Sequence, residues 1–358
     1  MNYLARQKQF AHVLKEAGLD GFVISHAPNL RYLCGYSGSN GLLLFLGERR
    51  IFFTDGRYTE QAREEVQSAR VIIAKGALLE AAGKLLARVK SAAIGFEGDH
   101  TTVVAAKDLR KVAHRNIVWK PTAGLIMRQR MVKDADELRT VRNAVNLGAE
   151  IYKKALEAVR PGVPEAEVAG RLEFAARRGG ADGMSFDTIV AGGRRGALPH
   201  GRASVQALPR RGFVVIDSGV VLEGYCSDMT RTVHIGRIAR EERMWYDAVL
   251  EAQLAAISAV KPGAMAGEVD RAARDVLRRH KLDRYFTHST GHGVGLEIHE
   301  PPRLGRGQQE PLKPGMVITI EPGIYVPERG GIRIEDMVLV TAGGSEILTP
   351  ISKDLLEH

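Results

Sequence analysis

The feature that most constrains the fold is a motif that occurs twice in the second half of the chain. Each copy has a β-branched apolar run, a turn containing glycine and a second apolar run, which is the pattern of a β-hairpin. The predicted turns fall at 223–224 and at 329–331. Each hairpin carries two carboxylates, which are Asp217 and Asp228 in the first copy and Glu321 and Glu335 in the second.

The two acids of each hairpin are expected to face each other. Residues that face across a hairpin lie at equal distances from its turn, and the midpoint of each acid pair falls at or beside the predicted turn. Like charges placed in this way destabilise a sheet, and carboxylates that share a site raise each other's pKa. Acids that merely end strands are the alternative, but the arrangement occurs twice. We therefore expect a compensating cation among the four carboxylates.

The hairpins belong to a longer internal repeat. The sequence AVRPG at 158–162 recurs as AVKPG at 259–263, at an offset of 101, and the match continues with small insertions. Chance similarity between Pro-Gly turns would not also align the acids and a histidine. We expect a domain with internal pseudo-two-fold symmetry, in which the carboxylates converge where the halves meet. The aligned pairs are Asp217 and Glu321, Asp228 and Glu335, and His200 and His299.

Two domains are predicted. Residues 1–122 alternate helix-like and strand-like periods and are expected to form an α/β domain, and residues 123–358 an α+β domain. Residues 121–132 have no clear period and are expected to connect the two. A capping box at Asp134 and Glu137 begins a long helix that the Pro-Gly turn at 160–162 ends. The predicted N-terminal strands are 21–25, 41–46, 50–54, 71–74, 92–96 and 117–119, and the helices are 3–17, 58–66, 78–89 and 103–112.

Composition excludes several functions. The two cysteines, Cys34 and Cys226, fall in different predicted domains, which argues against a disulfide framework and fits a reducing cytoplasm. Neither a signal peptide nor an apolar run long enough to cross a membrane is present, so no membrane association is expected. The net charge of +9 raises the question of nucleic-acid binding. The basic residues alternate with acids along helical segments, so we do not expect nucleic acid as a partner.

Residues 287–300 have no counterpart in the first half and contain His288, His292 and His299 between glycines. The glycines argue against a helix, and so against a helical zinc-protease motif. One histidine can complete an otherwise all-oxygen ligand set. Four carboxylates and one imidazole suit two divalent ions, Mn²⁺ or Co²⁺, with Zn²⁺ or Fe²⁺ as alternatives. Two such ions about 3.5 to 4 Å apart can hold a bridging hydroxide and polarise a carbonyl, so the implied chemistry is hydrolysis.

These motifs resemble those of the pita-bread metallopeptidases, which include methionine aminopeptidase, aminopeptidase P and prolidase. The resemblance covers almost the whole chain and rests on IDSG at 216–219, SDMTRT at 227–232, GHGVG at 291–295, EPG at 321–323 and GIRIED at 331–336. It implies a pita-bread fold and two bound ions. Asp228 and Glu335 would bridge the ions. The five implied metal ligands are Asp217, Asp228, His292, Glu321 and Glu335.

The resemblance also implies roles in catalysis and substrate binding. Glu321 would carry the proton of the bridging water, and two histidines would contact the scissile peptide and its tetrahedral intermediate. Tyr325 is similar to a site tyrosine of aminopeptidase P. The implied catalytic residues are Glu321, His200, His299 and Arg333, and the implied substrate-binding residues are His200, His288, His299, Tyr325 and Arg333.

Within this family, an N-terminal α/β domain points to the proline-specific branch, because methionine aminopeptidases usually lack it. Polar-aromatic clusters at 29–33 and 54–58 resemble that branch's N-terminal motifs. The resemblance implies a homodimer that acts on proline-containing peptides. A non-catalytic binding protein on the same fold is the less favoured alternative, because all five implied ligands are present.

Two activities remain open. An Xaa-Pro dipeptidase, or prolidase, must hold a free substrate carboxylate, best done by arginine, and must close the far end of its cleft. An aminopeptidase P acts on longer peptides and must leave that end open. The compact chain, without further domains, favours the dipeptidase.

Overall fold

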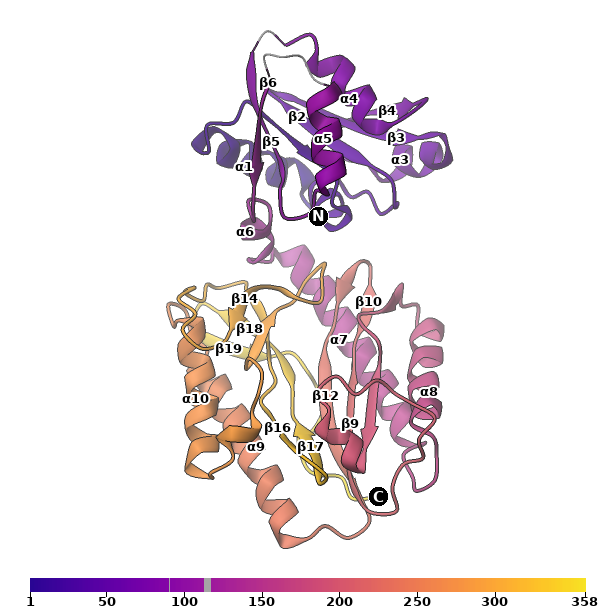
Figure 1. Cartoon of the computed structure of the whole chain (residues 1–358), viewed down its shortest axis with the longest axis vertical. Helices are drawn as coiled ribbons and strands as arrows, with labels where there is room; N and C mark the ends of the chain where they lie inside the picture. The colour runs from indigo at the N-terminus through magenta and orange to yellow at the C-terminus, as the bar shows by residue number, and fades with distance from the viewer. Residues whose placement is uncertain (90, 113–116) are drawn as a thin grey trace. The chain divides into compact units, whose positions relative to one another are not determined.

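The computed structural model describes residues 1–89, 91–112 and 117–358. The chain divides into two compact units, Met1–Arg130 and Met131–His358, called here the N-terminal and C-terminal units (Figure 1). Within the described ranges, no helix combines the length and the hydropathy that a membrane span requires.

The N-terminal unit is built on a six-stranded sheet with the strand order β4-β3-β2-β1-β5-β6. Successive residues of a strand point to opposite faces, so Phe22 packs edge to face on Phe10 of α1, while Val23 joins the cluster that contains Leu86 of α4. Helices therefore cover both faces. The strands are β1 Gly21–Ile24, β2 Leu42–Leu46, β3 Arg49–Asp55, β4 Arg70–Ala74, β5 Ala92–Glu97 and β6 Ile117–Thr122, and the helices are α1 Tyr3–Glu16, α2 Ala27–Cys34, α3 Thr59–Glu65, α4 Leu78–Leu86, α5 Val103–Val112 and α6 Met127–Arg130, with the 3-10 helix η1 Gly56–Tyr58.

Two elements of this unit were not predicted. Helix α2 covers the cluster at 29–33, where the sequence indicated only polar and aromatic residues near a strand end. The helix is stabilised by tertiary contacts that a period cannot reveal, since Asn29 donates to Glu97 Oε1 at 2.7 Å and accepts from Arg130 Nη1 at 2.8 Å. The prediction that 121–132 is only a connection was wrong, because β6 extends to Thr122 and 127–130 form the single turn of α6.

The C-terminal unit has two halves, each with a pair of helices packed on β-sheet. Helix α7 packs with α8, and α9 with α10; in Figure 1, α8 lies at the right of this unit, α9 and α10 lie at the left, and α7 runs behind β9, β10 and β12. The helices are α7 Ala135–Leu156, α8 Glu165–Arg178, α9 Arg240–Ala259 and α10 Ala266–Arg279, with the 3-10 helices η2 Gly193–Ala197 and η3 Asp283–Tyr285. The strands are β7 Gly183–Met184, β8 Ile189–Gly192, β9 Gly212–Ser218, β10 Val220–Leu222, β11 Tyr225–Cys226, β12 Met229–Ile235, β13 Gly291–Gly293, β14 Glu300–Leu304, β15 Val317–Ile320, β16 Gly323–Val326, β17 Gly330–Arg333, β18 Asp336–Thr341 and β19 Gly344–Ile347.

The halves are related as the repeat predicted. Helices α8 and α10 have the same length and begin 101 residues apart, at Glu165 and Ala266. The isolated bridge between Pro164 and Ala207 in the first half has a counterpart between Met265 and Pro311 in the second. The first half contains sheets β12-β9-β8 and β11-β10-β7, and the second contains β14-β13-β15-β18-β19 and β16-β17. The pseudo-two-fold α+β domain is thereby confirmed.

Helix α7 begins as the sequence predicted, with the capping box in place. Asp134 Oδ1 accepts from the Glu137 backbone at 2.9 Å, and Glu137 Oε2 accepts from the Asp134 backbone at 2.9 Å. The helix ends at Leu156, a little before the Pro-Gly turn, because the next residues form tighter bonds to carbonyls three positions back.

The predicted pairing of acids holds in one hairpin and fails in the other. In the second hairpin, Ile320 pairs with Asp336 and Gly323 with Arg333, so equal counts bring Glu321 and Glu335 to facing positions. In the first hairpin, by contrast, the expectation was wrong, because Asp217 faces Thr230 and not Asp228. A tight turn at 223–224 places the hairpin centre one residue later than assumed, which moves the pairing by two.

The second turn also lies earlier than expected. The chain turns at 327–329, whereas the predicted turn residues Gly330 and Gly331 belong to β17. Close packing explains the second glycine, since a Cβ at Gly331 would lie 2.0 Å from the carbonyl oxygen of Gly196.

Candidate metal and substrate site

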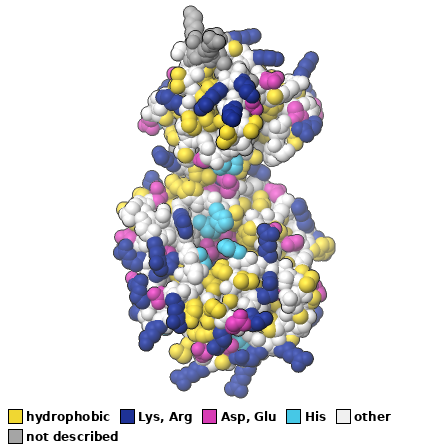
Figure 2. All heavy atoms as spheres, in the orientation of Figure 1, with side chains coloured by type: hydrophobic (Ala, Val, Ile, Leu, Met, Phe, Trp, Pro, Cys, Tyr) yellow, Lys and Arg dark blue, Asp and Glu magenta, His cyan; other side chains and the backbone are white. Residues whose placement is uncertain are grey.

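All ten residues that the sequence selected for the site line one cavity of about 890 Å³ in the C-terminal unit. Histidine and acidic side chains gather in the middle of this unit's face in Figure 2. Both halves contribute, as the symmetry requires. The ten residues are His200, Asp217, Asp228, His288, His292, His299, Glu321, Tyr325, Arg333 and Glu335.

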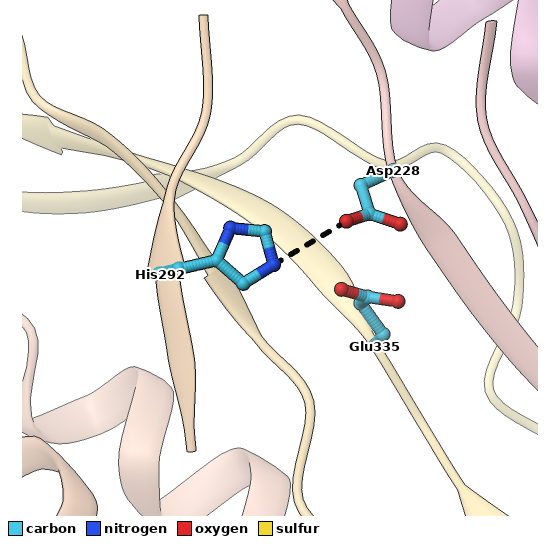
Figure 3. Close-up of side chains that lie close together, drawn as sticks. All are labelled: Asp228, His292 and Glu335. Atoms are coloured by element: carbon cyan, nitrogen blue, oxygen red, sulfur yellow. Dashed lines mark ion pairs between the residues drawn. The ribbon is translucent and has the colours of Figure 1, made fainter. Parts of the chain in front are cut away.

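Three of these side chains point toward one another (Figure 3). One ligand atom each from Asp228, His292 and Glu335 can be chosen so that all lie within 4.8 Å of one another. His292, in the middle of β13, places Nε2 3.6 Å from Asp228 Oδ2 and 3.5 Å from Glu321 Oε1. Asp228 and Glu335 lie in corresponding breaks, between β11 and β12 and between β17 and β18. The breaks turn both carboxylates away from the strand ladders and toward His292.

Asp217 contributes the remaining carboxylate from β9. Its Oδ2 accepts from Arg333 Nη2 at 2.6 Å, while its Oδ1 is buried and accepts no hydrogen bond from any residue that the structure describes. A buried carboxylate oxygen without a partner is costly unless a cation or donor satisfies it. This oxygen, three further acids and an imidazole form a donor set of the type that divalent ions of hard to intermediate character bind. The residues therefore fit a metal centre.

The raised pKa values of the clustered carboxyl groups also indicate that the site suits a cation. Burial is the largest cause that raises the pKa of Asp228 well above its usual range. The negative charges of Glu335, Asp217 and Glu321 raise it further. Burial is also the largest cause that raises the pKa of Glu335 well above its usual range, and the negative charges of Glu321 and Asp217 add to it. Burial and Asp217 raise the pKa of Glu321 to about 8, although Arg333 opposes them. Without a cation, these acids do not all ionise at neutral pH.

His292 is oriented for ligation. Its Nδ1 lies 3.0 Å from the carbonyl oxygen of Gly293, and because a carbonyl only accepts, Nδ1 carries the proton. Nε2, which faces the acids, is then unprotonated. Burial lowers the pKa of His292 to about 4, so the imidazole is neutral, as a metal ligand must be.

Arg333 connects several of the site residues. Its guanidinium donates to Asp217, to the Tyr325 hydroxyl at 2.7 Å and to the Pro199 carbonyl at 3.1 Å. Its Nε donates at 3.1 Å to Thr230 Oγ1, which in turn donates at 2.7 Å to Glu335 Oε2. Arg333 and Thr230 therefore link the carboxylates of the two halves.

A directed chain of hydrogen bonds continues from Arg333 through Tyr325 to His288. His288 Nδ1 donates to the Ser289 carbonyl at 2.8 Å, which leaves Nε2 to accept from the Tyr325 hydroxyl, also at 2.8 Å. Burial and Arg333 lower the pKa of His288 to about 4. The neutral ring and the buried tyrosine are thus fixed in one proton arrangement.

His200 and His299 are both exposed along the cavity, one from each half. The ring of His299 packs edge to face on His292, with 4.4 Å between centroids. Burial lowers the pKa of His299, and the neighbouring His200 lowers it further. Imidazoles on the cavity wall can donate or accept hydrogen bonds with a bound peptide.

Sequence reasoning missed two residues of this site. Thr230 lies within the SDMTRT motif, so its place beside Asp228 was a signal that could have been used. Arg303, in β14, lines the cavity and donates from Nε to Ser289 Oγ at 2.7 Å. Its signal was its position four residues after His299, on the strand that leaves the histidine stretch.

A pseudo-symmetric α+β domain with acids and histidines converging in one cavity defines a metal-dependent hydrolase. Residues 139–342 match metallopeptidase family M24, and residues 6–132 match the Creatinase/Prolidase N-terminal domain. The chain belongs to metallopeptidase family M24 and is a peptidase, and this family membership implies divalent metal ions. The resemblance, the fold class and the enzymatic nature predicted from the sequence are confirmed.

Relatives match the chain over its whole length. The Xaa-Pro dipeptidase of Pyrococcus furiosus is 36% identical over 354 residues, which cover 98% of this chain and 99% of the relative. The solved structure of the Xaa-Pro dipeptidase from Bacillus anthracis is 36% identical with a TM-score of 0.96, covering 100% of both chains. The X-Pro aminopeptidase of Thermotoga maritima is 33% identical with a TM-score of 0.90, covering 97% of this chain and 100% of the other.

Proposed function

We propose that this peptidase is an Xaa-Pro dipeptidase that cleaves the peptide bond before proline. The observation that carries the proposal is the state of Arg303 in the cavity wall. Arg303 donates to a serine hydroxyl and forms no ion pair with any described residue. By contrast, Arg333 is bound to Asp217, and Arg202 to Asp187. Arg303 is therefore suited to bind the free carboxylate of a dipeptide.

The proposed catalytic domain, residues 123–358, holds two divalent ions. Mn²⁺ or Co²⁺ is preferred, with Zn²⁺ as the alternative, because the ligand set has oxygens and one imidazole and no thiolate. Asp228 and Glu335 would help to hold the ions from the two halves, which is supported by their corresponding positions. Bound ions would polarise the scissile carbonyl and activate the attacking water. The proposed ligands are Asp217, Asp228, His292, Glu321 and Glu335.

The remaining steps depend on side chains of this chain. Glu321 would accept the proton of the attacking water on a carboxylate oxygen and deliver it to the departing proline nitrogen. His200 and His299 would donate hydrogen bonds to the scissile peptide and its tetrahedral intermediate, supported by their places along the cavity. Arg333 and Tyr325 would keep His288 and Asp217 in position through the hydrogen bonds described above.

An Xaa-Pro aminopeptidase is the second candidate. The close fold of the Thermotoga maritima X-Pro aminopeptidase favours it, since that structure superposes almost as well as the dipeptidases. The two activities differ in the group that follows proline, which is a free carboxylate in a dipeptide and an amide in a longer peptide. A cationic Arg303 at that position favours the carboxylate.

The test compares an Xaa-Pro dipeptide with an Xaa-Pro-Xaa tripeptide, using metal-stripped protein and protein to which Mn²⁺, Co²⁺ or Zn²⁺ has been restored. Metal-dependent cleavage of the dipeptide alone is expected. Preferential cleavage of the tripeptide would make the protein an aminopeptidase. If neither substrate is cleaved with any of these metals, the results would favour the alternative hypothesis of a non-catalytic binding protein.

We further propose a homodimer that works in the cytoplasm. Both cysteines are buried and free, which supports a reducing compartment. Burial raises the pKa of the Cys34 thiol to about 12, so this thiol stays protonated and unreactive. Light scattering coupled to size exclusion would give the mass of the assembly against the 39.1 kDa chain.

A further inference from the structure

Arg231 follows Asp228 by three residues in the SDMTRT motif and contacts the backbone of Glu335. Its side chain in β12 is buried, and its guanidinium donates to five acceptors. One acceptor is the carboxylate of Asp336, at 2.7 Å, and the other four are backbone carbonyls. The carbonyls belong to Thr230 at 2.9 Å, Glu335 at 2.5 Å, Ile351 at 2.7 Å and Ser352 at 3.0 Å.

The contact with Glu335 matters because this residue lies in the break between β17 and β18. Sheet pairing therefore does not fix its backbone. Its N–H donates to the Thr230 carbonyl at 3.1 Å, its carbonyl accepts from Arg231 Nη1, and its carboxylate accepts from Thr230 Oγ1. Two successive residues of β12 thus hold Glu335 at its amide, its carbonyl and its side chain.

Arg231 is itself held firmly. Asp336 is fully buried, and its carboxylate also accepts from Gln253 Nε2 at 2.8 Å and from Lys353 Nζ at 2.7 Å. Loss of Arg231 would therefore leave Asp336 paired with a cation, while the carbonyl of Glu335 would lose its donor. Only arginine has a planar fork that reaches acceptors on several sides at once, because lysine offers a single nitrogen.

We propose that Arg231 is a positioning residue that fixes Glu335 and thereby sets the affinity of the site for divalent metal. The inference rests on the proposed role of Glu335 as a metal ligand. Metal–ligand distances tolerate only about 0.2 Å, and loss of an outer partner of a ligand typically weakens metal binding by roughly 10- to 100-fold. A backbone shift at Glu335 that exceeds this tolerance would take its carboxylate out of ligating position.

The experiment measures Mn²⁺ affinity by calorimetry, and the absorption spectrum of the Co²⁺ form, for the full-length wild type and the variants Arg231→Met and Arg231→Lys. Arg231→Met should weaken Mn²⁺ binding by about 10- to 100-fold. It should also change the Co²⁺ spectrum, which reports ligand geometry. Arg231→Lys should recover part of the affinity, because its ammonium can still donate to some of these acceptors.

The matched control is Leu172→Ala in α8, a fully buried apolar residue of the first half. It should lower the melting temperature with Mn²⁺ affinity and Co²⁺ spectrum unchanged. If Arg231→Met behaves in the same way, Arg231 is only structural and the inference is wrong. Should Arg231→Met fail to fold, Asp336→Asn replaces it, since this change weakens the hold on Arg231 and predicts a smaller loss of affinity in the same direction.

The outcome also separates this inference from the proposed function. A wild type that binds neither Mn²⁺ nor Co²⁺ would overturn the metal site, and the inference with it. A wild type that binds metal while Arg231→Met binds it equally well would overturn the inference alone.

Discussion

Arg333 Nη2 lies 2.6 Å from Asp217 Oδ2, and both side chains are buried in the cavity wall. This is the one cation that the described residues place in contact with any of the four clustered carboxylates. If all four ionise, one guanidinium leaves three negative charges without a partner. Bound divalent cations would offset these charges, and such compensation is what so many acids in one buried place require.

Removing the carboxylate of Asp228 or Glu335, two of the proposed metal ligands, should abolish most of the activity without harming the metal-free fold. Asp228→Asn and Glu335→Gln should each lower metal-dependent turnover by at least about 100-fold, since even an outer partner of a ligand contributes 10- to 100-fold. The neutral amides remove repulsion, so the metal-free variants should melt at or above the wild-type temperature. Circular dichroism with chelator and peptidase assays check both parts. Unchanged turnover in both variants would contradict the two-metal proposal.

The stability of the metal-free protein should fall as pH rises. The folded pKa of Glu321 is about 8, above its ordinary value of 4.5, so between these values the folded state holds a proton that the unfolded state has lost. The stabilisation is complete below the unfolded pKa and disappears as pH rises through the folded pKa. Asp228 and Glu335 act in the same direction.

Thermal melts in chelator at about pH 5 and about pH 8 test this dependence against Glu321→Gln, which should show a smaller fall. Added Mn²⁺ should raise the melting temperature more at the higher pH, because metal competes with protons for the carboxylates. An equal pH dependence in wild type and variant would show that Glu321 is not responsible.

Much of the candidate site could be predicted from the sequence because its proposed ligands lie in short motifs within a repeat. The internal repeat, followed through its small insertions, was enough to pair Asp228 with Glu335, and both line the cavity. The facing positions of Glu321 and Glu335 followed from counting residues about one turn. Counting failed for Asp217, because an error of one residue in the hairpin centre moves the partner by two.

Residues that act through tertiary contacts were beyond sequence reasoning. Helix α2 depends on the bond from Asn29 to Glu97, which lies 68 positions away in the chain. The guanidinium of Arg303 forms no ion pair with a residue that the structure describes, and this could be recognised only after Arg333 and Arg202 were seen to have carboxylate partners. These contacts depend on which side chains lie close together in the folded protein, and neither hydrophobic periodicity nor a sequence motif indicates that.

Arg303 should determine preference for dipeptides. Arg303→Met should raise KM for an Xaa-Pro dipeptide by about 10- to 100-fold, the worth of a charge-assisted hydrogen bond of roughly 1.5–3 kcal/mol, while KM for an Xaa-Pro-Xaa tripeptide stays unchanged. Steady-state kinetics on both substrates give the comparison. The matched control is Arg202→Met, since Arg202 lines the same cavity but pairs with Asp187. Equal changes on dipeptide and tripeptide would remove the argument for a dipeptidase.

Tyr325→Phe should separate positioning from metal binding. The hydroxyl accepts from Arg333 Nη1 and donates to His288 Nε2, so its loss leaves His288 Nε2 without its donor, while Arg333 Nη1 still donates to the Pro199 carbonyl. Arg333 still holds Asp217 through Nη2, and metal affinity should therefore be retained.

The expected result is a fall in kcat of about 10-fold or more, with a stability loss of roughly 1–3 kcal/mol. Tyr246→Phe is the matched control, because this buried tyrosine donates to the Lys353 carbonyl at 2.9 Å outside the cavity. It should cost similar stability and leave kcat unchanged. If both variants reduce kcat equally, the effect of Tyr325 is general to the fold. If Tyr325→Phe loses metal instead, the hydroxyl acts on Asp217 through Arg333, and the two roles are not separable.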